Sequence, residues 1–409
     1  MQKPVFMIGW EFPPHYSGGL GIACQGLARG LTEEGEKLVF ALPTSFSSGG
    51  GTSSRKSYKK GIYNPTPQTQ MEMVYVNAQL HPYWRAGASS SQDFAIAAAH
   101  IDLYDETKRY GKVVAQVAED YPTQKLIHAH DWMSIPAAIQ TRERLRKPML
   151  LQIHSTEFDR SGGGQPNAQI AEIEYAGMNA ADKIVAVSAY TKAMIMEKYG
   201  ISGDKIEVVH NGIDPNPEYH DQPLPQFLAA RPVVVFMGRL TIQKGPEYFL
   251  AVAKKVIEVE PKAIFVLAGE GDMFQSLLVS AAAQQLTGSV LFAGFLREKE
   301  KELMYKRATV FVMPSVSEPF GIVALEAALA GAPVIASKNS GVLEVLPQAE
   351  AIDFWDINKM TEAVLRHVRR PAAQTRSNQQ AAVAQQSMQK LNWRDAAHRM
   401  RAVYKKLLN

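Results

Sequence analysis

Short apolar runs alternate with longer stretches of helical periodicity along most of this chain. In the first half the runs cover residues 5–9, 38–42, 72–76, 126–129, 149–153, 184–187 and 206–209, and in the second half residues 233–237, 263–268, 290–293, 310–313 and 334–336. Helical periodicity covers residues 23–34, 94–118, 135–146 and 189–199. Since a short buried run followed by a helix is typical of a parallel sheet, the pattern predicts two doubly wound, Rossmann-like α/β domains.

Two segments interrupt this alternation. Residues 43–61 are rich in Ser and Gly and predict a mobile surface loop. The Pro-rich stretch at 214–225 predicts a domain boundary, which we place between residues 217 and 218. The second domain then covers residues 218–390, and a basic amphipathic helix falls in a terminal unit of residues 391–409. Ligands of doubly wound sheets bind beyond the carboxyl ends of the strands, so we expect a shared site in a cleft between the domains.

Composition narrows the class of protein. The chain has 409 residues, 46% of them hydrophobic and 21% charged, which is globular composition. A net charge of +4 without a long basic run gives no reason to expect nucleic acid. Cys24 is the only cysteine, so we expect no disulfide within the chain, no cysteine-based zinc site and a reducing, cytoplasmic location. No apolar stretch approaches the roughly 20 residues of a membrane span.

A glycine pair follows the first apolar run. Gly18 and Gly19 lie in the loop at residues 11–21, directly before a predicted helix. Backbone N–H groups at the start of a helix bind phosphate well. The alternative is a plain turn.

Two cations follow the first run of the second half. Arg239 comes directly after residues 233–237 and Gly238, and Lys244 lies five residues further on. Two cations at a strand end can hold a diphosphate and neutralise it as it leaves. The alternative is that both are solvated surface cations.

Two glutamates, Glu318 and Glu326, occur in the segment 317–331 with seven residues between them. Glu326 is the only charge in an apolar helical pattern. A buried carboxylate needs a partner, and either ribose hydroxyls or an internal group such as a neighbouring Lys would serve. Glu318 precedes the helix, where it can face a reacting sugar.

Further polar residues and glycines follow other apolar runs. His154 follows residues 149–153, and His130 with Asp131 follows residues 126–129. Either His154 or His130 could face the cleft, and a structural role is the alternative. We expect that His128 and His130 do not both point the same way on their strand. Gly269 and Gly271 follow residues 263–268 and predict either a turn that admits a ligand or a simple βα loop.

These motifs together resemble the GT-B glycosyltransferases, in particular glycosyltransferase family 4 and the related bacterial and archaeal glycogen synthases. The most specific piece is the Glu318 to Glu326 segment, which is similar to the donor-binding motif of retaining family members. The segment 238–245, the segment 211–214 and the opening segment 10–20 occur at matching places. The chain departs from the glycogen synthase pattern at Ser17, where a Lys commonly precedes the glycine pair.

The resemblance implies a role for each motif. The domain of residues 1–217 would bind the acceptor, the domain of residues 218–390 would bind a UDP-, ADP- or GDP-sugar, and the terminal helix would cross back to the first domain. The implied catalytic residues are His154, Glu318, Arg239 and Lys244, and the implied donor-binding residues are Gly18, Gly19, Arg239, Lys244, Gly269, Gly271, Phe320, Gly321, Ile322 and Glu326. His130 and Asp131 are acceptor-side candidates.

The resemblance further implies transfer of a hexosyl group, with glucose expected, and with retention at the anomeric carbon. The acceptor would be a carbohydrate such as a glycogen-like α-glucan. No Asp-x-Asp motif occurs at a metal-binding spacing, so we expect no metal cofactor and expect Arg239 and Lys244 to meet the charge of the diphosphate.

Other functions remain open at this point. A nucleotide-sugar epimerase or a phosphorylase would use a similar two-domain cleft, and a family 4 transferase could act on another glycan, a glycolipid or a small molecule. An NAD-dependent oxidoreductase is disfavoured because no Gly-x-Gly-x-x-Gly follows the first apolar run. A non-catalytic glucan-binding protein is a further alternative, and the basic terminal helix could touch anionic lipid.

Overall fold

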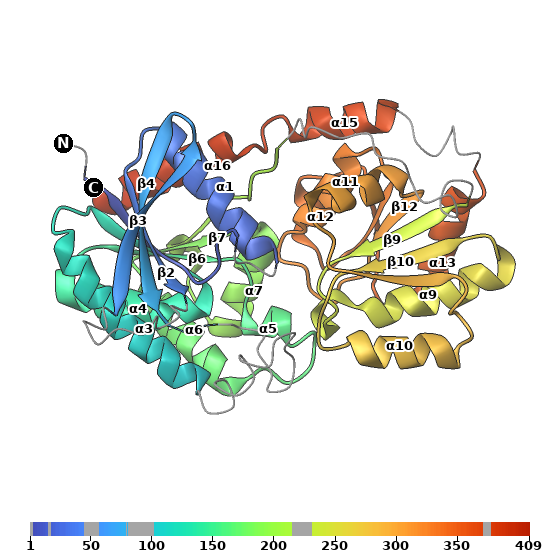
Figure 1. Cartoon of the computed structure of the whole chain (residues 1–409), viewed down its shortest axis with the longest axis horizontal. Coiled ribbons are helices and arrows are strands. Elements are labelled where there is room, and N and C mark those ends of the chain that lie inside the picture. The colour runs from blue at the N-terminus through green and yellow to red at the C-terminus, as the bar shows by residue number, and fades with distance from the viewer. Residues whose placement is uncertain are drawn as a thin grey trace, which may run out of the picture.

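The computed structural model describes residues 3–14, 18–44, 57–78, 80, 102–214, 231–370 and 378–409. The chain forms two α/β lobes side by side, each with one sheet covered by helices (Figure 1). The first lobe contains the sheet of strands β1 to β8 and the second contains the sheet of β9 to β14. The expectation of two doubly wound domains is confirmed. The expected boundary between residues 217 and 218 lies outside the described residues.

The sheet of the first lobe has the strand order β3-β4-β2-β1-β5-β6-β7-β8, in which only the β3 and β4 pair is antiparallel. Its strands are β1 (Val5–Ile8), β2 (Leu38–Thr44), β3 (Tyr58–Thr66), β4 (Thr69–Asn77), β5 (Leu126–His130), β6 (Met149–Ile153), β7 (Lys183–Ala186) and β8 (Ile206–Val208). The helices are α1 (Gly19–Glu33), α3 (Leu103–Val117), α4 (Asp131–Leu145), α5 (Glu157–Arg160), α6 (Ala168–Ala180) and α7 (Ala189–Tyr199). The central strands β1, β5 and β6 are buried at every residue, as their apolar sequences require.

The expected loop at residues 43–61 is wrong at both ends. Strand β2 extends to Thr44 and strand β3 begins at Tyr58, while residues 45–56 lie outside the described part of the chain. Strand β3 pairs with β4 at the edge of the sheet and is largely solvent-facing. The sequence analysis did not predict this strand, because its lysines interrupt any apolar run. Charged residues are nevertheless common on edge strands.

The sheet of the second lobe is fully parallel, with the order β11-β10-β9-β12-β13-β14. Its strands are β9 (Val233–Met237), β10 (Ile264–Ala268), β11 (Val290–Gly294), β12 (Val310–Met313), β13 (Val334–Ser337) and β14 (Glu350–Ile352). Its helices are α9 (Pro246–Val259), α10 (Phe274–Ala283), α11 (Glu298–Arg307), α12 (Ile322–Leu329), α13 (Ile357–Val368) and α15 (Asn378–Met388). All five apolar runs expected in this half are strands, and β14 is an additional edge strand.

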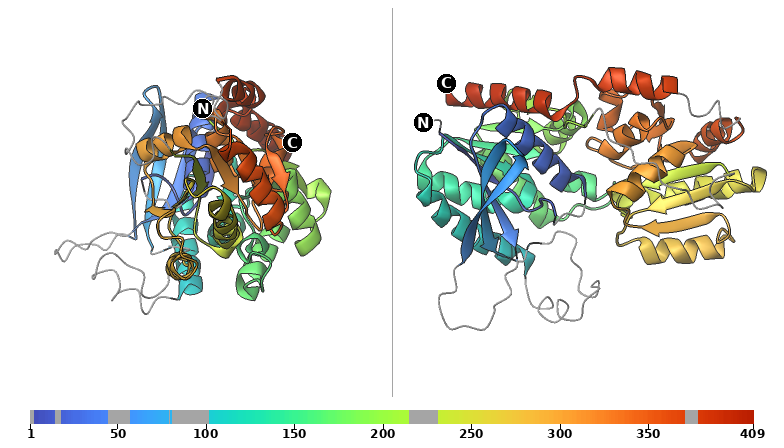
Figure 2. Two further views of the ribbon diagram at one scale, coloured as in Figure 1. Left: turned by 90° about the vertical axis from the view of Figure 1, so that its right-hand side faces the viewer. Right: turned by 45° about the horizontal axis from the view of Figure 1, so that its top comes forward.

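The C-terminal helix α16 (Trp393–Leu408) lies along α1 of the first lobe, as both views in Figure 2 agree. The side chain of Trp393 is 7% exposed and packs where α1 carries Gly26. Arg401 donates to both Glu34 and Glu36 at the end of the same helix. The last segment of the chain is therefore part of the first lobe's packing. Within the described residues, no helix combines the length and apolarity needed to cross a membrane.

The contact between α1 and α16 generates a stability prediction. A Cβ on Gly26 would lie 2.1 Å from Cε2 of Trp393, so the two helices meet only because residue 26 has no side chain. We expect Gly26→Ala to lower the free energy of unfolding by about 1–3 kcal/mol, even though alanine is the better helix former.

Urea denaturation followed by circular dichroism measures this effect. Gly288→Ala is the matched control, because a Cβ there meets nothing within 4 Å, and it should change stability by less than about 0.5 kcal/mol. Equal stabilities of the two variants would contradict the packing argument.

Candidate active site

The Glu318 segment lies at the junction of the two lobes. Ser317 donates from its hydroxyl to Oδ1 of Asp159 in the first lobe at 2.5 Å, and Ser188 of the first lobe donates to the carbonyl of Pro319 at 2.6 Å. Glu344 of the second lobe accepts the backbone N–H groups at the start of α7, each at 2.9 Å. Both lobes therefore fix the position of this segment.

Glu318 and Lys244 form a bidentate ion pair at this junction. The ammonium Nζ of Lys244 lies 2.9 Å from Oε1 and 2.8 Å from Oε2 of Glu318, and Ser315 donates to Oε2 at 3.2 Å. Only 7% of the Glu318 side chain and 23% of the Lys244 side chain is exposed. The sequence analysis predicted that both residues belong to one site, and in the structure their side chains are in direct contact. The carboxylate is consequently held in a single orientation.

Arg239 lies beside the first turn of α1. Helix α1 begins at Gly19 with Gly18 as its N-cap residue, which has no side chain to cap the first N–H groups. A Cβ on Gly18 would lie 3.6 Å from Cδ of Arg239, whereas a Cβ on Gly19 would meet nothing within 4 Å. The structure thus brings the predicted glycine pair of one lobe to the predicted cation of the other. Backbone N–H groups and a guanidinium at one place suit an anion.

Glu326 has internal partners, which was one of the two alternatives at the sequence level. Lys301 of α11 donates to Oε1 at 2.9 Å and the hydroxyl of Tyr305 donates to Oε2 at 2.8 Å. The Glu326 side chain is 21% exposed and is therefore not fully buried. A ribose contact for Glu326 remains a prediction.

Gly269 and Gly271 are glycines for a structural reason. Gly269 has φ +136°, and a Cβ there would lie 1.8 Å from the carbonyl oxygen of Gly238. A Cβ on Gly271 would lie 2.3 Å from the carbonyl oxygen of Leu240. The two loops that follow β9 and β10 pack backbone against backbone at these positions. Their donor contacts remain predictions, but packing alone explains the residue type.

The residues between the two glutamates shape the start of α12. Phe320 is buried, and its ring stacks on His210 with a centroid distance of 5.8 Å. Gly321 is the N-cap residue and has φ +97°, which favours glycine, and Ile322 begins the helix. The segment therefore turns sharply between Glu318 and the helix.

His154 follows β6 and is 9% exposed. Its Nε2 lies 3.1 Å from Nδ1 of His130, which ends the neighbouring strand β5. Burial lowers the pKa of His154 to about 3 and that of His130 well below its usual value. Both imidazoles are consequently neutral at physiological pH, and His154 can act there as a hydrogen-bonding group and not as a cation.

Asp131 positions the backbone of His154. Its carboxylate is 3% exposed and accepts the N–H groups of His154 at 2.6 Å and Ser155 at 3.4 Å. Asp131 itself has φ 56°, an uncommon conformation for a residue other than glycine. The Oδ1 atom of Asp131 therefore holds the backbone of the loop that carries His154. Contact between Asp131 and an acceptor remains a prediction.

The expectation that His128 and His130 cannot point the same way on their strand is wrong. Their ring centroids are 4.3 Å apart, because alternate residues of a strand share one face of the sheet. His128 also bonds the hydroxyl of Tyr404 on α16 at 2.8 Å and Oε1 of Gln152 at 3.1 Å. A row of buried imidazoles therefore leads from the C-terminal helix to His154.

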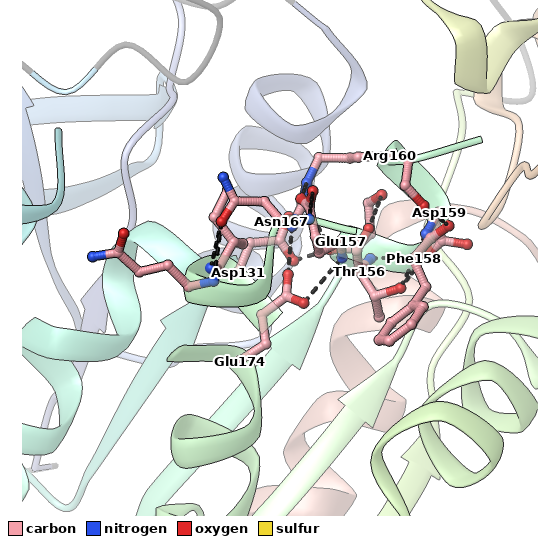
Figure 3. A network of polar contacts seen from close by, with 12 residues as sticks. Asp131, Thr156, Glu157, Phe158, Asp159, Arg160, Asn167 and Glu174 are labelled. Atoms are coloured by element: carbon pink, nitrogen blue, oxygen red, sulfur yellow. Dashed lines mark hydrogen bonds and ion pairs between the residues drawn. The ribbon is translucent and has the colours of Figure 1, made fainter. Parts of the chain in front are cut away.

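Sequence reasoning missed the polar network that supports the segment after His154, which is shown in Figure 3. Arg160 pairs with Glu157 at 3.0 Å and with Glu174 at 2.5 Å, and Glu174 also accepts the N–H of Glu157 at 2.9 Å. Thr156 and Asp159 form a capping box at the start of α5. The capping-box spacing was a detectable signal for α5, whereas Glu174 comes from the next helix, α6, and no local spacing indicates its contact with α5.

Comparisons with known proteins agree with this arrangement. A family model described as Glycosyltransferase Family 4 matches residues 112–217, and one described as Glycosyl transferases group 1 matches residues 225–383. An uncharacterised glycosyltransferase of Methanocaldococcus jannaschii is 29% identical over 379 residues, which are 88% of this chain and 86% of that protein. A glycogen synthase of Mycobacterium tuberculosis is 28% identical over 352 residues, which are 84% of this chain and 80% of that protein.

A solved structure shows the same fold over the whole chain. The sucrose-phosphate synthase from Thermosynechococcus elongatus matches with a TM-score of 0.76 and 20% identity, covering 99% of both chains. Two α/β lobes with a site at their junction are the architecture of the GT-B class. Both matching family models describe glycosyltransferases. This chain belongs to the GT-B glycosyltransferases.

The buried carboxylate of Asp131 generates a pH prediction. Burial raises its pKa from 3.8 to about 7, against the opposing effect of the N–H donors of His154 and Ser155. A raised folded-state pKa means that this contribution to stability is complete below pH 3.8 and is lost as the pH rises through about 7. We expect the stability of the wild type relative to Asp131→Asn to fall across this window, with a limiting slope of about 1.4 kcal/mol per pH unit.

Urea denaturation at a series of pH values measures the difference, and subtracting the variant cancels the opposite trend that the buried histidines produce. Asp105→Asn is the control, since the Asp105 side chain is 76% exposed, and it should follow the wild type at every pH. If the free energies of unfolding of the wild type and Asp131→Asn change in parallel with pH, the pKa of the Asp131 carboxyl is not raised.

Proposed function

We propose that this glycosyltransferase moves a glucosyl group from a nucleoside diphosphate glucose to a hydroxyl of an α-glucan, with retention at the anomeric carbon. The observation that carries the proposal is that Arg239, from the same lobe as the Lys244 and Glu318 pair, lies beside the glycine-capped start of α1 in the other lobe. The similarity to a glycogen synthase supports the choice of donor sugar and acceptor.

The charge of the donor's diphosphate is met by protein groups in this proposal. The guanidinium of Arg239 and the N–H groups of the first turn of α1 hold the phosphates, and Lys244 adds its positive charge while Glu318 keeps its position. As the bond between C1 and the phosphate oxygen breaks, the electron pair remains on the diphosphate. These cations stabilise that developing charge.

The neutral state of His154 decides its proposed role. With a pKa of about 3, its imidazole donates or accepts a hydrogen bond to a donor-sugar hydroxyl and leaves the charges of the site unchanged. The acceptor hydroxyl enters on the face that the diphosphate leaves, and a leaving phosphate oxygen takes its proton. Atoms and charge balance without a separate base, and the new bond retains the configuration at C1.

The acceptor is the least constrained part of the proposal. The departure at Ser17 from the usual glycogen synthase pattern falls outside the described residues. A family 4 transferase with another glycan, glycolipid or small-molecule acceptor is therefore the second candidate. A nucleotide-sugar epimerase would instead return an epimerised nucleotide sugar, with neither nucleoside diphosphate release nor an acceptor product.

A donor screen tests the proposed activity. Purified protein is incubated with UDP-, ADP- and GDP-glucose and with glycogen or maltooligosaccharides, and released nucleoside diphosphate and chain length are measured. We expect release from one glucose donor together with elongation through α-linkages. Release without elongation would refute the glucan acceptor, and no release from any donor would refute the transferase activity on glucose.

Loss of the proposed cations should lower turnover. We expect Arg239→Ala and Lys244→Ala each to reduce kcat by on the order of 10²-fold, by analogy with removal of one transition-state donor. Lys255→Ala is the control, because Lys255 is an exposed cation of α9 whose ammonium donates to the side-chain oxygen of Asn358, and it should keep wild-type kcat. Unchanged kcat in both site variants would show that other groups neutralise the diphosphate.

A further inference from the structure

The only cysteine of the chain lies next to the two histidines of the junction. Cys24 on α1, His130 at the end of β5 and His154 after β6 each offer one ligand atom, and these atoms lie within 4.8 Å of one another. A single cysteine can still take part in a metal site when histidines supply the other ligands. The neighbouring positions of β5 and β6 in the sheet place the imidazoles side by side, and α1 brings the thiol to them.

The three groups are buried. Cys24 is 1%, His130 0% and His154 9% exposed. Within the described part of the chain, the buried Nε2 atom of His130 has no hydrogen-bond partner. A buried polar atom without a partner costs roughly 1–3 kcal/mol, and a ligand there would remove this cost. The unsatisfied nitrogen is therefore a second observation, independent of the thiol, that points to a bound group.

The set of ligand atoms selects the kind of ion. One sulfur and two imidazole nitrogens suit thiophilic cations, whereas Ca²⁺ and Mg²⁺ prefer oxygen ligands. Zinc with bonds of about 2.3 Å to sulfur and about 2.0 Å to nitrogen needs ligand atoms roughly 3.3–3.6 Å apart. The observed limit of 4.8 Å requires the side chains to close by about 1 Å. Three protein ligands leave a fourth position for water.

We propose that Cys24, His130 and His154 bind one Zn²⁺ ion, and that this ion inhibits the transferase by holding the imidazole of His154. The thiol loses its proton to solvent when the ion binds, and no electron transfer is involved. The inhibition rests on the proposed function, because it requires His154 to contact the sugar. The binding of the ion does not depend on that function.

Cobalt spectroscopy tests the binding without any assay of activity. Protein freed of metal with EDTA is titrated with Co²⁺, and the near-ultraviolet charge-transfer band of a thiolate on cobalt is followed. We expect a band that saturates at one ion per chain and that Zn²⁺ abolishes. Cys24→Ser should lack the band and bind Zn²⁺ at least about 10-fold more weakly in competition with a coloured chelator.

His398→Ala is the matched control, because His398 is exposed on α16, and it should bind both ions as the wild type does. Circular dichroism checks that each variant is folded, and Cys24→Ala replaces the serine variant if that variant unfolds. A wild type without the band, or a cysteine variant that keeps it, would overturn the site.

The donor screen then decides the effect of the ion. We expect Zn²⁺ to lower nucleoside diphosphate release by the wild type and not by Cys24→Ser, with EDTA restoring the wild-type rate. Binding of cobalt together with an unchanged rate in Zn²⁺ would overturn the inhibition and leave the metal site standing. If no donor is turned over, the transferase proposal fails while the cobalt titration still decides the site.

Discussion

The carboxylate of Asp159 is the contact on which the geometry of the junction depends. It is fully buried, and its Oδ2 accepts the N–H and the hydroxyl of Thr156 at 2.7 and 2.8 Å. Its Oδ1 accepts the hydroxyl of Ser317, the residue before Glu318, from the other lobe. One side chain therefore ties the loop that follows His154 to the segment that carries Glu318. Because a buried carboxylate is costly without several donors, this arrangement has little freedom to shift.

The two lobes contribute different chemistry to the junction. The first lobe supplies the glycine-capped start of α1 and a row of buried imidazoles whose pKa values are lowered by burial. The second lobe supplies Arg239 and the ion pair of Lys244 with Glu318. Positive charge thus comes mainly from one lobe, and neutral hydrogen-bonding groups come from the other. This division fits a donor whose charge lies on its diphosphate and whose sugar is neutral.

The helix α16 links the end of the chain to the first lobe's part of the site. Its Tyr404 bonds His128, and the His128 ring contacts the ring of His130, which in turn bonds His154. The same helix packs through Trp393 against the glycine face of α1, the helix whose first turn lies beside Arg239. Packing far from the junction consequently determines the position of two of its components.

The sequence alone predicted the two doubly wound lobes, because continuous apolar runs have few alternatives to buried parallel strands. It also predicted Gly18, Arg239, Lys244, Glu318 and His154 as site residues, because each lies in a segment that connects a strand to the helix after it, where this fold places ligands. Short-range order along the chain was sufficient for these inferences.

Only the tertiary structure decided which residues touch. The partners of Glu326, the tie between Asp159 and Ser317 and the cluster of Cys24 with His130 and His154 join residues that are far apart in the chain. Strand order and helix packing bring such residues together. Neither can be predicted from the local periodicity of the sequence. Gly269 illustrates the same limit, since its residue type follows from the approach of a neighbouring backbone that no pattern within its own segment reveals.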